Sequence, residues 1–439
     1  MSNSKPNIVY IHSHDTGRYI QPYGYAVPTP NLQKLAEQGV IFRQAFCANP
    51  TCSASRAALL TGCYPHQNGM EGLAHRGWSL NDYKMHLVHT LKGAGYRTAL
   101  SGVQHVASHR EGEPYKTIGY DEYLGHPGEA ELKAAQYIRN YDSKEPFFLA
   151  VGFGETHRDF PERLEEDNPN YLQPPAPLPD TPETRKDMAD YIAIARRLDR
   201  KMGVVFNAIE DAGIEGETLV ICTTDHGIAF PRMKCNLTDD GIGIMLLMRG
   251  PAGFEGGKCV DALVSHVDIF PTLCDMLDIE RPDWLEGESV LPLVNGEKDV
   301  IHDEIFAEVN YHASYEPMRC VRTDRYKYIR RFDGRSRPVL PNCDDSVSKT
   351  LWYESGWLDQ EVAEESFFDL MFDPHETSNQ VDNPRYKNAV DMLRNRMEEW
   401  RKATGDPLLE NDVVPAPEKA VVNDPDKYSP KDRPDRVSK

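Results

Sequence analysis

The feature that most constrains the fold is the alternation of short apolar runs with amphipathic stretches over the first two-thirds of the chain. Between two of the runs, apolar residues recur at helical spacing over residues 188–209, and Thr29-Pro30 begins an earlier helix that Gly39 ends. The runs that we interpret as buried strands cover residues 7–11, 96–100, 147–153, 219–222 and 241–248. This alternation predicts an α/β sandwich with a mostly parallel sheet between helices.

The character of the sequence changes after about residue 312. Residues 318–329 and 330–335 resemble an antiparallel hairpin, residues 337–365 are polar and irregular, and Asn383-Pro384 begins a last amphipathic helix. We therefore predict a catalytic domain over residues 1–312 and a smaller C-terminal α+β subdomain with an antiparallel sheet over residues 313–439. The last thirty or so residues are rich in proline and charge, which predicts an extended arm or a disordered tail.

Composition excludes several classes of function. A net charge of -20 over 439 residues argues against a nucleic-acid partner. No apolar run is long enough to span a bilayer, so no membrane partner is expected. Nine cysteines, an odd number, suit a reduced protein, and we expect a cytoplasmic location, or a periplasmic one if a leader was removed. A homo-oligomer is left open.

Histidine or aspartate follows four of the predicted strands. The carboxyl ends of parallel strands meet at one edge of a sheet, where ligands bind. Each residue alone could be a hydrogen-bonded loop residue, but four such strand ends together favour a convergent active site. The residues concerned are His14, Asp15, His105, His157, Asp225 and His226.

A cysteine begins the most informative short motif. Cys52 is followed by Arg56 one helical turn later, so both side chains can face the same pocket, and Thr61-Gly62 ends the segment. Short matches to this spacing are common, and a buried cysteine at the start of an ordinary helix is the alternative.

The segment from Cys52 to Gly62 resembles the signature of the type I sulfatases. His14-Asp15-Thr16-Gly17 and Asp225-His226-Gly227 stand where that family has its two metal motifs. The resemblance implies an alkaline-phosphatase-like sandwich and oxidation of Cys52 to formylglycine. One hydroxyl of the hydrated aldehyde would attack sulfur, and the second would later lose its proton and expel sulfate.

The resemblance also implies a divalent metal held by His14, Asp15, Asp225 and His226. Calcium is the ion that the family usually holds, and carboxylate oxygens suit it. Two of the four residues here are histidines, and imidazole favours manganese or zinc, so Mn2+, Mg2+ and Zn2+ stay open as alternatives. His14 is also left open as a non-ligand.

Further roles follow from matching positions. Arg56 would stabilise the ionised diol, His105 would hydrogen-bond it, His157 would protonate the leaving group and Lys234 would hold the sulfate.

The sequence departs from the family at Val103, where the family usually has a lysine two residues before the histidine. Gln104 offers no charge, and Arg110 or Arg158 are the candidates to replace the missing cation.

Segments at residues 65–70, 317–319 and 373–379 resemble the branch of N-sulfoglucosamine sulfohydrolase (sulfamidase) and its bacterial relatives. That branch also contains enzymes that act on O-sulfated polysaccharides, so the scissile bond stays open. The predicted substrate is a sulfated saccharide, as in glycosaminoglycan degradation. His66, Gln67, Glu308 and Arg319 are the candidates for reading the sugar, with a structural role as the alternative for each.

Ala54 stands where the commonest form of the signature has proline, and this version resembles the substrates of the anaerobic radical maturase. Two other functions remain open. One is a phosphonate or phosphate ester hydrolase of the alkaline phosphatase superfamily. The other is a carbohydrate-binding pseudo-sulfatase, which only the missing lysine at Val103 supports.

Overall fold

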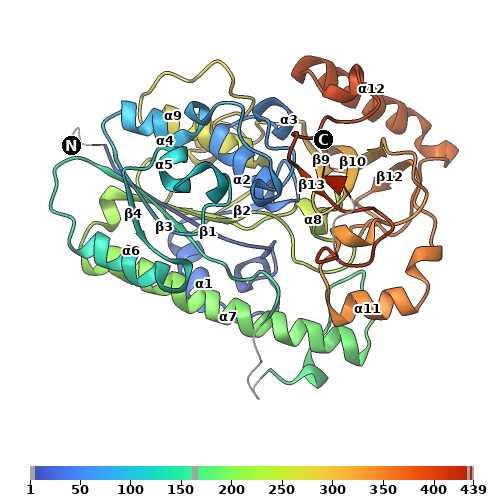
Figure 1. Cartoon of the computed structure of the whole chain (residues 1–439). Coiled ribbons are helices and arrows are strands. Elements are labelled where there is room, and N and C mark those ends of the chain that lie inside the picture. Colours follow the sequence, from blue (N-terminus) through green and yellow to red (C-terminus); the bar gives the residue numbers. More distant parts are fainter. Residues whose placement is uncertain (1–4, 161–166, 433–435, 438–439) are drawn as a thin grey trace.

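A large mixed sheet forms the centre of the protein, and helices cover both of its faces (Figure 1). The computed structural model describes residues 5–160, 167–432 and 436–437. The strand order is β4-β3-β5-β1-β6-β7-β2-β8, and every neighbouring pair is parallel except the two pairs that involve β7. The bounds are β1 Asn7–Ser13, β2 Val40–Phe46, β3 Arg97–Gly102, β4 Glu122–Gly125, β5 Phe147–Gly152, β6 Thr218–Thr224, β7 Leu246–Arg249 and β8 Lys258–Ser265.

Helices α1, α6 and α7 lie on one face of this sheet, and α2, α4, α5 and α9 lie on the other (Figure 1). The long helix α7 buries Leu198, Met202 and Val205 against Val9 and Leu149 of the sheet, which confirms the helix predicted from the apolar spacing. The bounds are α1 Pro30–Gln38, α2 Cys52–Thr61, α3 Pro65–Asn68, α4 Leu87–Gly93, α5 Pro114–Ile118, α6 Ala130–Arg139, α7 Pro182–Asp211, α8 Asp239–Ile242, α9 Ile269–Met276 and α10 Leu291–Val294. The predicted sandwich is therefore confirmed.

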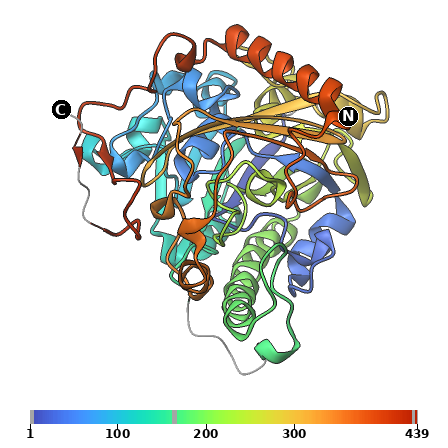
Figure 2. The ribbon, with the colours of Figure 1, turned by 90° about the vertical axis from the view of Figure 1, so that its right-hand side faces the viewer.

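A separate antiparallel sheet follows, in the order β12-β11-β10-β9. Helix α12 packs Val390, Leu393 and Met397 against Val321 and Phe367 of this sheet, and Figure 2 shows it, in red, along the outside of the strands. The bounds are β9 Glu304–Tyr311, β10 Tyr315–Thr323, β11 Tyr326–Arg331, α11 Val347–Glu354, β12 Glu365–Asp369 and α12 Lys387–Thr404. This sheet already begins at β9, and the domain boundary at residue 312 stays a prediction.

Three predictions of local structure were wrong in part. The apolar run 241–248 begins in α8, and only its second half is a strand. Both halves are buried, and periodicity alone cannot distinguish a short buried helix from a buried strand. The predicted hairpin has its turn at Asp324-Arg325, inside the run assigned to the first strand, where Thr323 Oγ1 accepts from the backbone N–H of Tyr326 at 2.9 Å. Residues 337–365, predicted as a loop, contain α11.

The described part of the C-terminal tail is a packed arm. Arg76 donates to the carbonyl of Val421 at 3.3 Å and to Asn423 Oδ1 at 3.0 Å, and β13 Val421–Val422 pairs with β14 Arg436–Val437. Residues 433–435 and 438–439 of the predicted tail lie outside the described residues. Among the helices that the structure describes, none combines the length and the apolar character needed to cross a bilayer.

The carboxyl ends of four adjacent strands are level with one another. Gly102 of β3 and His12 of β1 both pair with Gly152 of β5, and Ser13 of β1 pairs with Thr224 of β6. Gly102 has a φ of +83°, and a Cβ there would lie 2.2 Å from the carbonyl oxygen of Gly152. Only glycine therefore lets β3 turn beside β5 into the segment that carries His105.

We expect Gly102→Ala to lower the free energy of unfolding by about 2–3 kcal/mol, because the added methyl group meets backbone and the residue must keep a positive φ. Urea unfolding of the whole chain measures this. Gly93→Ala is the matched control, since Gly93 ends α4 with open space around it and should gain about 0.5–1 kcal/mol. Equal effects of the two substitutions would contradict the close approach.

Candidate active site

Two aspartates at adjacent strand ends form the centre of the site. Asp15 follows β1 and Asp225 follows β6, and the backbone N–H of Asp15 donates to Asp225 Oδ1 at 2.8 Å. Asp15 has a φ of +48°, a left-handed conformation that aspartate tolerates better than most residues. The sheet thus brings together two residues that are 210 positions apart.

Asp225 is surrounded by a guanidinium, an imidazole and backbone donors. Arg56 donates to Asp225 Oδ2 at 2.9 Å, His14 Nδ1 lies 3.2 Å from the same oxygen, and the backbone N–H of His226 donates to Oδ1 at 3.0 Å. Burial alone would raise the pKa of Asp225, but His226, Arg56 and His14 together hold this pKa well below its ordinary value. The carboxylate is therefore ionised although it is buried.

Arg56 lies on α2, is almost fully buried, and contacts residues at the carboxyl ends of β1 and β6. Besides Asp225, its guanidinium donates to the carbonyl of Ser13 at 2.8 Å and contacts His12 Nδ1. Arg56 and Cys52 both lie in α2, four residues apart, so the helical turn predicted between them is confirmed.

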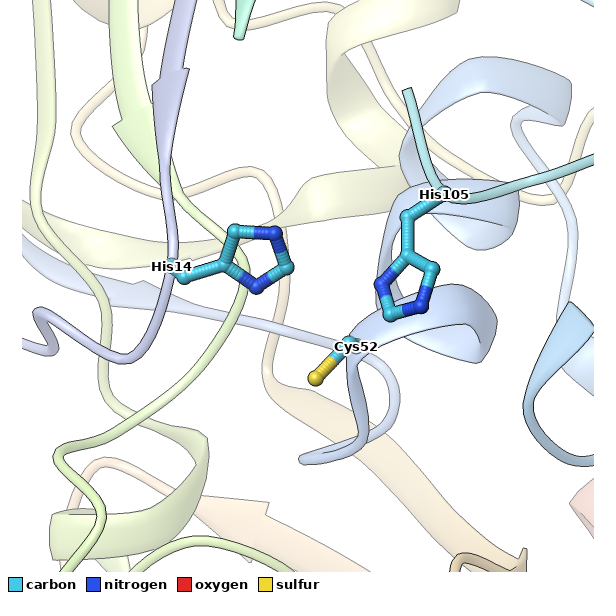
Figure 3. Close-up of side chains that lie close together, drawn as sticks. All are labelled: His14, Cys52 and His105. Atoms are coloured by element: carbon cyan, nitrogen blue, oxygen red, sulfur yellow. The ribbon is translucent and has the colours of Figure 1, made fainter. Parts of the chain in front are cut away.

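Cys52 is the first residue of α2 and only 2% exposed. Its Sγ lies 3.4 Å from His226 Nε2, and Figure 3 shows its side chain with those of His14 and His105, which come from the segments after β1 and β3. The ligand atoms of these last three side chains lie within 4.8 Å of one another. Burial raises the pKa of the Cys52 thiol well above its ordinary value, against the opposing effect of Lys234.

Lys234 is buried between two carboxylates. Its Nζ donates to Asp15 Oδ2 at 2.9 Å and to Asp344 Oδ2 at 2.8 Å, and His157 Nε2 lies 3.5 Å away. Burial would lower the pKa of Lys234, but Asp15 and Asp344 raise it well above the ordinary value. Lys234 is a fixed positive charge beside Cys52 and suits an anionic ligand.

Two histidines border the open side of the site. His105 Nε2 lies 3.2 Å from His75 Nδ1, and burial holds the pKa of His105 well below its ordinary value. His157 is exposed, and its Nδ1 contacts the carbonyl of Arg158, which leaves Nε2 directed at Lys234.

Sequence reasoning missed several residues that the fold adds to the site. Asp344 comes from the segment predicted as a loop, and His75 from a short turn; neither belongs to a motif or follows a strand. His12 could have been found, because it directly follows the predicted strand at residues 7–11; it is buried near the end of β1.

The four residues predicted to read the sugar lie in a different network. Arg319 is fully buried and donates to both oxygens of Asp406, at 2.9 and 2.8 Å, and Glu308 accepts from His66 at 3.0 Å. Gln67 donates to Glu286. The hydrogen bonds of Arg319 and Glu308 are taken up inside the protein, so this geometry gives their predicted sugar contacts no support.

The structure places neither proposed replacement for the missing lysine beside Cys52. Arg158 makes a bidentate pair with Asp187 at 2.7 and 2.8 Å, and Arg110 is exposed. Gln104 caps a turn by accepting from the N–H groups of Val106 and Ala107. Arg56 and Lys234 are the cations that lower the pKa of the Cys52 thiol in this structure.

The arrangement defines a class of protein: an α/β protein with a buried cysteine at the start of a helix, two cations and a cluster of oxygen and nitrogen donors at one sheet edge. The sulfatase family model matches residues 6–142 and 131–279, and the model described as "N-sulphoglucosamine sulphohydrolase, C-terminal" matches residues 231–337. The chain belongs to the sulfatase family, and the predicted class of sulfuric ester hydrolase is confirmed.

Two relatives cover most of the chain. Human N-sulphoglucosamine sulphohydrolase is 30% identical over 443 residues, which span 88% of this chain and 87% of the relative. An ulvan-active sulfatase of Formosa agariphila is 27% identical over 470 residues, with 92% of this chain and 76% of the relative covered.

Solved structures share the fold. One, in complex with its substrate D-glucosamine-2-N,6-O-disulfate, has a TM-score of 0.70 and 18% identity and covers 93% of this chain and 99% of that chain. A phosphonate monoester hydrolase of Agrobacterium radiobacter has a TM-score of 0.69 and 20% identity, with 91% and 96% covered. At these identities the likeness extends to the fold alone.

We expect Arg56→Met to lower the free energy of unfolding by about 3–5 kcal/mol, because it leaves the buried carboxylate of Asp225 without its guanidinium partner. Denaturant unfolding of the chain with Cys52 unmodified measures this. Arg97→Met is the control, since the Arg97–Glu122 pair is 48% and 43% exposed and is worth about 1 kcal/mol or less. A loss at Arg56 no larger than at Arg97 would refute the role assigned to this pair.

Proposed function

We propose that this chain hydrolyses sulfate from a sulfated saccharide, with formylglycine at position 52 and a divalent metal as cofactors. The observation that carries the proposal is the position of Cys52, buried at the start of α2 beside His226 and faced by Lys234, Arg56 and His105. The names of the human relative and of the matching C-terminal model support an aminosugar substrate. The sulfatase on ulvan keeps an O-sulfated polysaccharide open.

The residues at the centre fit a divalent metal. Asp15 Oδ1 is buried and accepts no hydrogen bond from the described residues. His226 Nδ1 lies 3.0 Å from the carbonyl of Gly227, so its N–H donates there and the lone pair of Nε2 faces Asp15 Oδ1 at 3.4 Å. Together with His14 and Asp225 these atoms would hold the ion, which supplies positive charge for the sulfate oxygens when bound.

The other side chains have distinct parts in the proposed reaction. When installed at position 52, formylglycine supplies a hydrated aldehyde as the nucleophile. Lys234 and Arg56 add fixed positive charge where the sulfate and the ionised diol gather negative charge. His157, with Nε2 at the open side, gives its proton to the departing sugar oxygen or nitrogen.

Sulfate release by matured protein tests the function. We expect release from glucosamine N-sulfate, from its 6-O-sulfate isomer, or from both, and Cys52→Ala should remove it. Release from the N-sulfate alone would define a sulfamidase, and release from the O-sulfate alone a carbohydrate O-sulfatase. Faster hydrolysis of a matched phosphate ester or phosphonate would favour the phosphohydrolase alternative, and an intact thiol after co-expression with either maturase would favour the pseudoenzyme.

The residues proposed to hold the metal predict a measurable preference among divalent ions. Restoring the family's oxygen donors with His14→Asp and His226→Asn should raise the affinity for Ca2+ relative to Mn2+ and Zn2+, because carboxylates and amides prefer hard cations. Calorimetry and thermal unfolding of the unmodified chain with each ion measure this, since an ion at 100 times its Kd stabilises by about 2.7 kcal/mol.

Asp211→Asn is the control for this comparison, because Asp211 lies on the surface in a pair with Arg139. If the order of ion affinities is the same in wild type and in the double variant, His14 and His226 do not hold the ion. The anaerobic maturase as partner, the cytoplasmic location and a homo-oligomer stay predictions.

A further inference from the structure

Asp344 places a carboxylate at the open side of a site otherwise suited to anions. Its Oδ2 accepts from Lys234 at 2.8 Å, and its side chain is 12% exposed. The ligand atoms of Asp344, His157 and Asp15 lie within 4.8 Å of one another. Asp344 is therefore beside the histidine that faces the leaving group in the proposed function.

The main chain around Asp344 is fixed from both sides. Lys349 is fully buried on α11, and its Nζ donates to the carbonyls of Cys343 and Tyr428, both at 2.7 Å, and to Asp345 Oδ1 at 2.9 Å. One residue earlier on the same helix, Ser348 donates to Asp187 Oδ2 at 2.6 Å. The turn that carries Asp344 is thus held in place by the protein itself, before any ligand binds.

The second carboxylate oxygen of Asp344 is free to meet a ligand. Oδ1 makes no hydrogen bond to the residues that the structure describes, whereas Oδ2 is occupied by Lys234. An ionised carboxylate accepts hydrogen bonds and repels other anions, most strongly where a low dielectric surrounds it. A hydroxyl or N–H group beside the scissile sulfate would be bound there, and a second sulfate would be repelled.

We propose that Asp344 determines specificity by accepting a hydrogen bond from the group that neighbours the scissile sulfate, so that the substrate is a saccharide sulfate with a free hydroxyl at that position. The inference rests on the proposed function. Asp344 would select among substrates by repulsion as well as by attraction, since a sulfate group next to the scissile sulfate would face its carboxylate.

Equilibrium binding to the whole chain with Cys52 unmodified tests this, because that form binds without turnover. Calorimetry in the presence of the divalent metal compares glucosamine N-sulfate with glucosamine N,3-O-disulfate. We expect wild type to bind the monosulfate at least tenfold more tightly, and Asp344→Asn to reduce this ratio at least fivefold. Asp211→Asn is the control, because it removes the same charge from a surface residue paired with Arg139 and should keep the wild-type ratio.

Three results would overturn the inference: equal binding of the two sugars by wild type, no binding of either, or an unchanged ratio in Asp344→Asn with both affinities lowered together. The last result would mean that Asp344 only positions Lys234. Sulfate release is scored separately on matured protein. A preserved binding preference without sulfate release would leave the inference standing while the proposed function fails.

Discussion

The structure of the site depends on the pairing of charges that are buried away from water. An unpaired carboxylate in such a place would be very costly, so Asp225 can be ionised only because Arg56, His14 and two backbone N–H groups surround it. These partners come from α2, from the end of β1 and from Asp225's own turn. One carboxylate therefore fixes the relative positions of the residues proposed to hold the metal and of the helix that begins with Cys52.

The same constraint extends to the C-terminal part of the chain. Lys234 balances Asp15 on one side and Asp344 on the other, so a residue from the segment between β11 and β12 of the second sheet completes the charge pairing at the edge of the first sheet. The sheet supplies the centre of the site, whereas the segment before α11 supplies its rim. This division suits a family in which one reaction is used on different substrates, because the rim can change without disturbing the buried pairs.

The sequence was most informative where chemistry follows a strand directly. The positions of Asp15, His105 and Asp225 could be predicted because a buried strand and its next polar residues are local features, and parallel strands end at one edge. Asp344 could not be predicted, since its role arises from contacts 110 and more residues away. Arg319 was predicted from its residue type to bind the sugar, and that role stays a prediction; its side chain is buried and donates to both carboxylate oxygens of Asp406.

The burial of Cys52 has a consequence for the order of events during synthesis. Under the proposed function, a maturase would need access to a thiol that is 2% exposed in the folded protein. His226, which covers the sulfur, is 174 residues further along the chain than Cys52. At about 5–20 residues per second, the ribosome needs about 10–35 s to add that stretch. The proposed oxidation of the cysteine would thus compete with translation, and any delay in delivering β6 would lengthen the time in which the nascent chain can be modified.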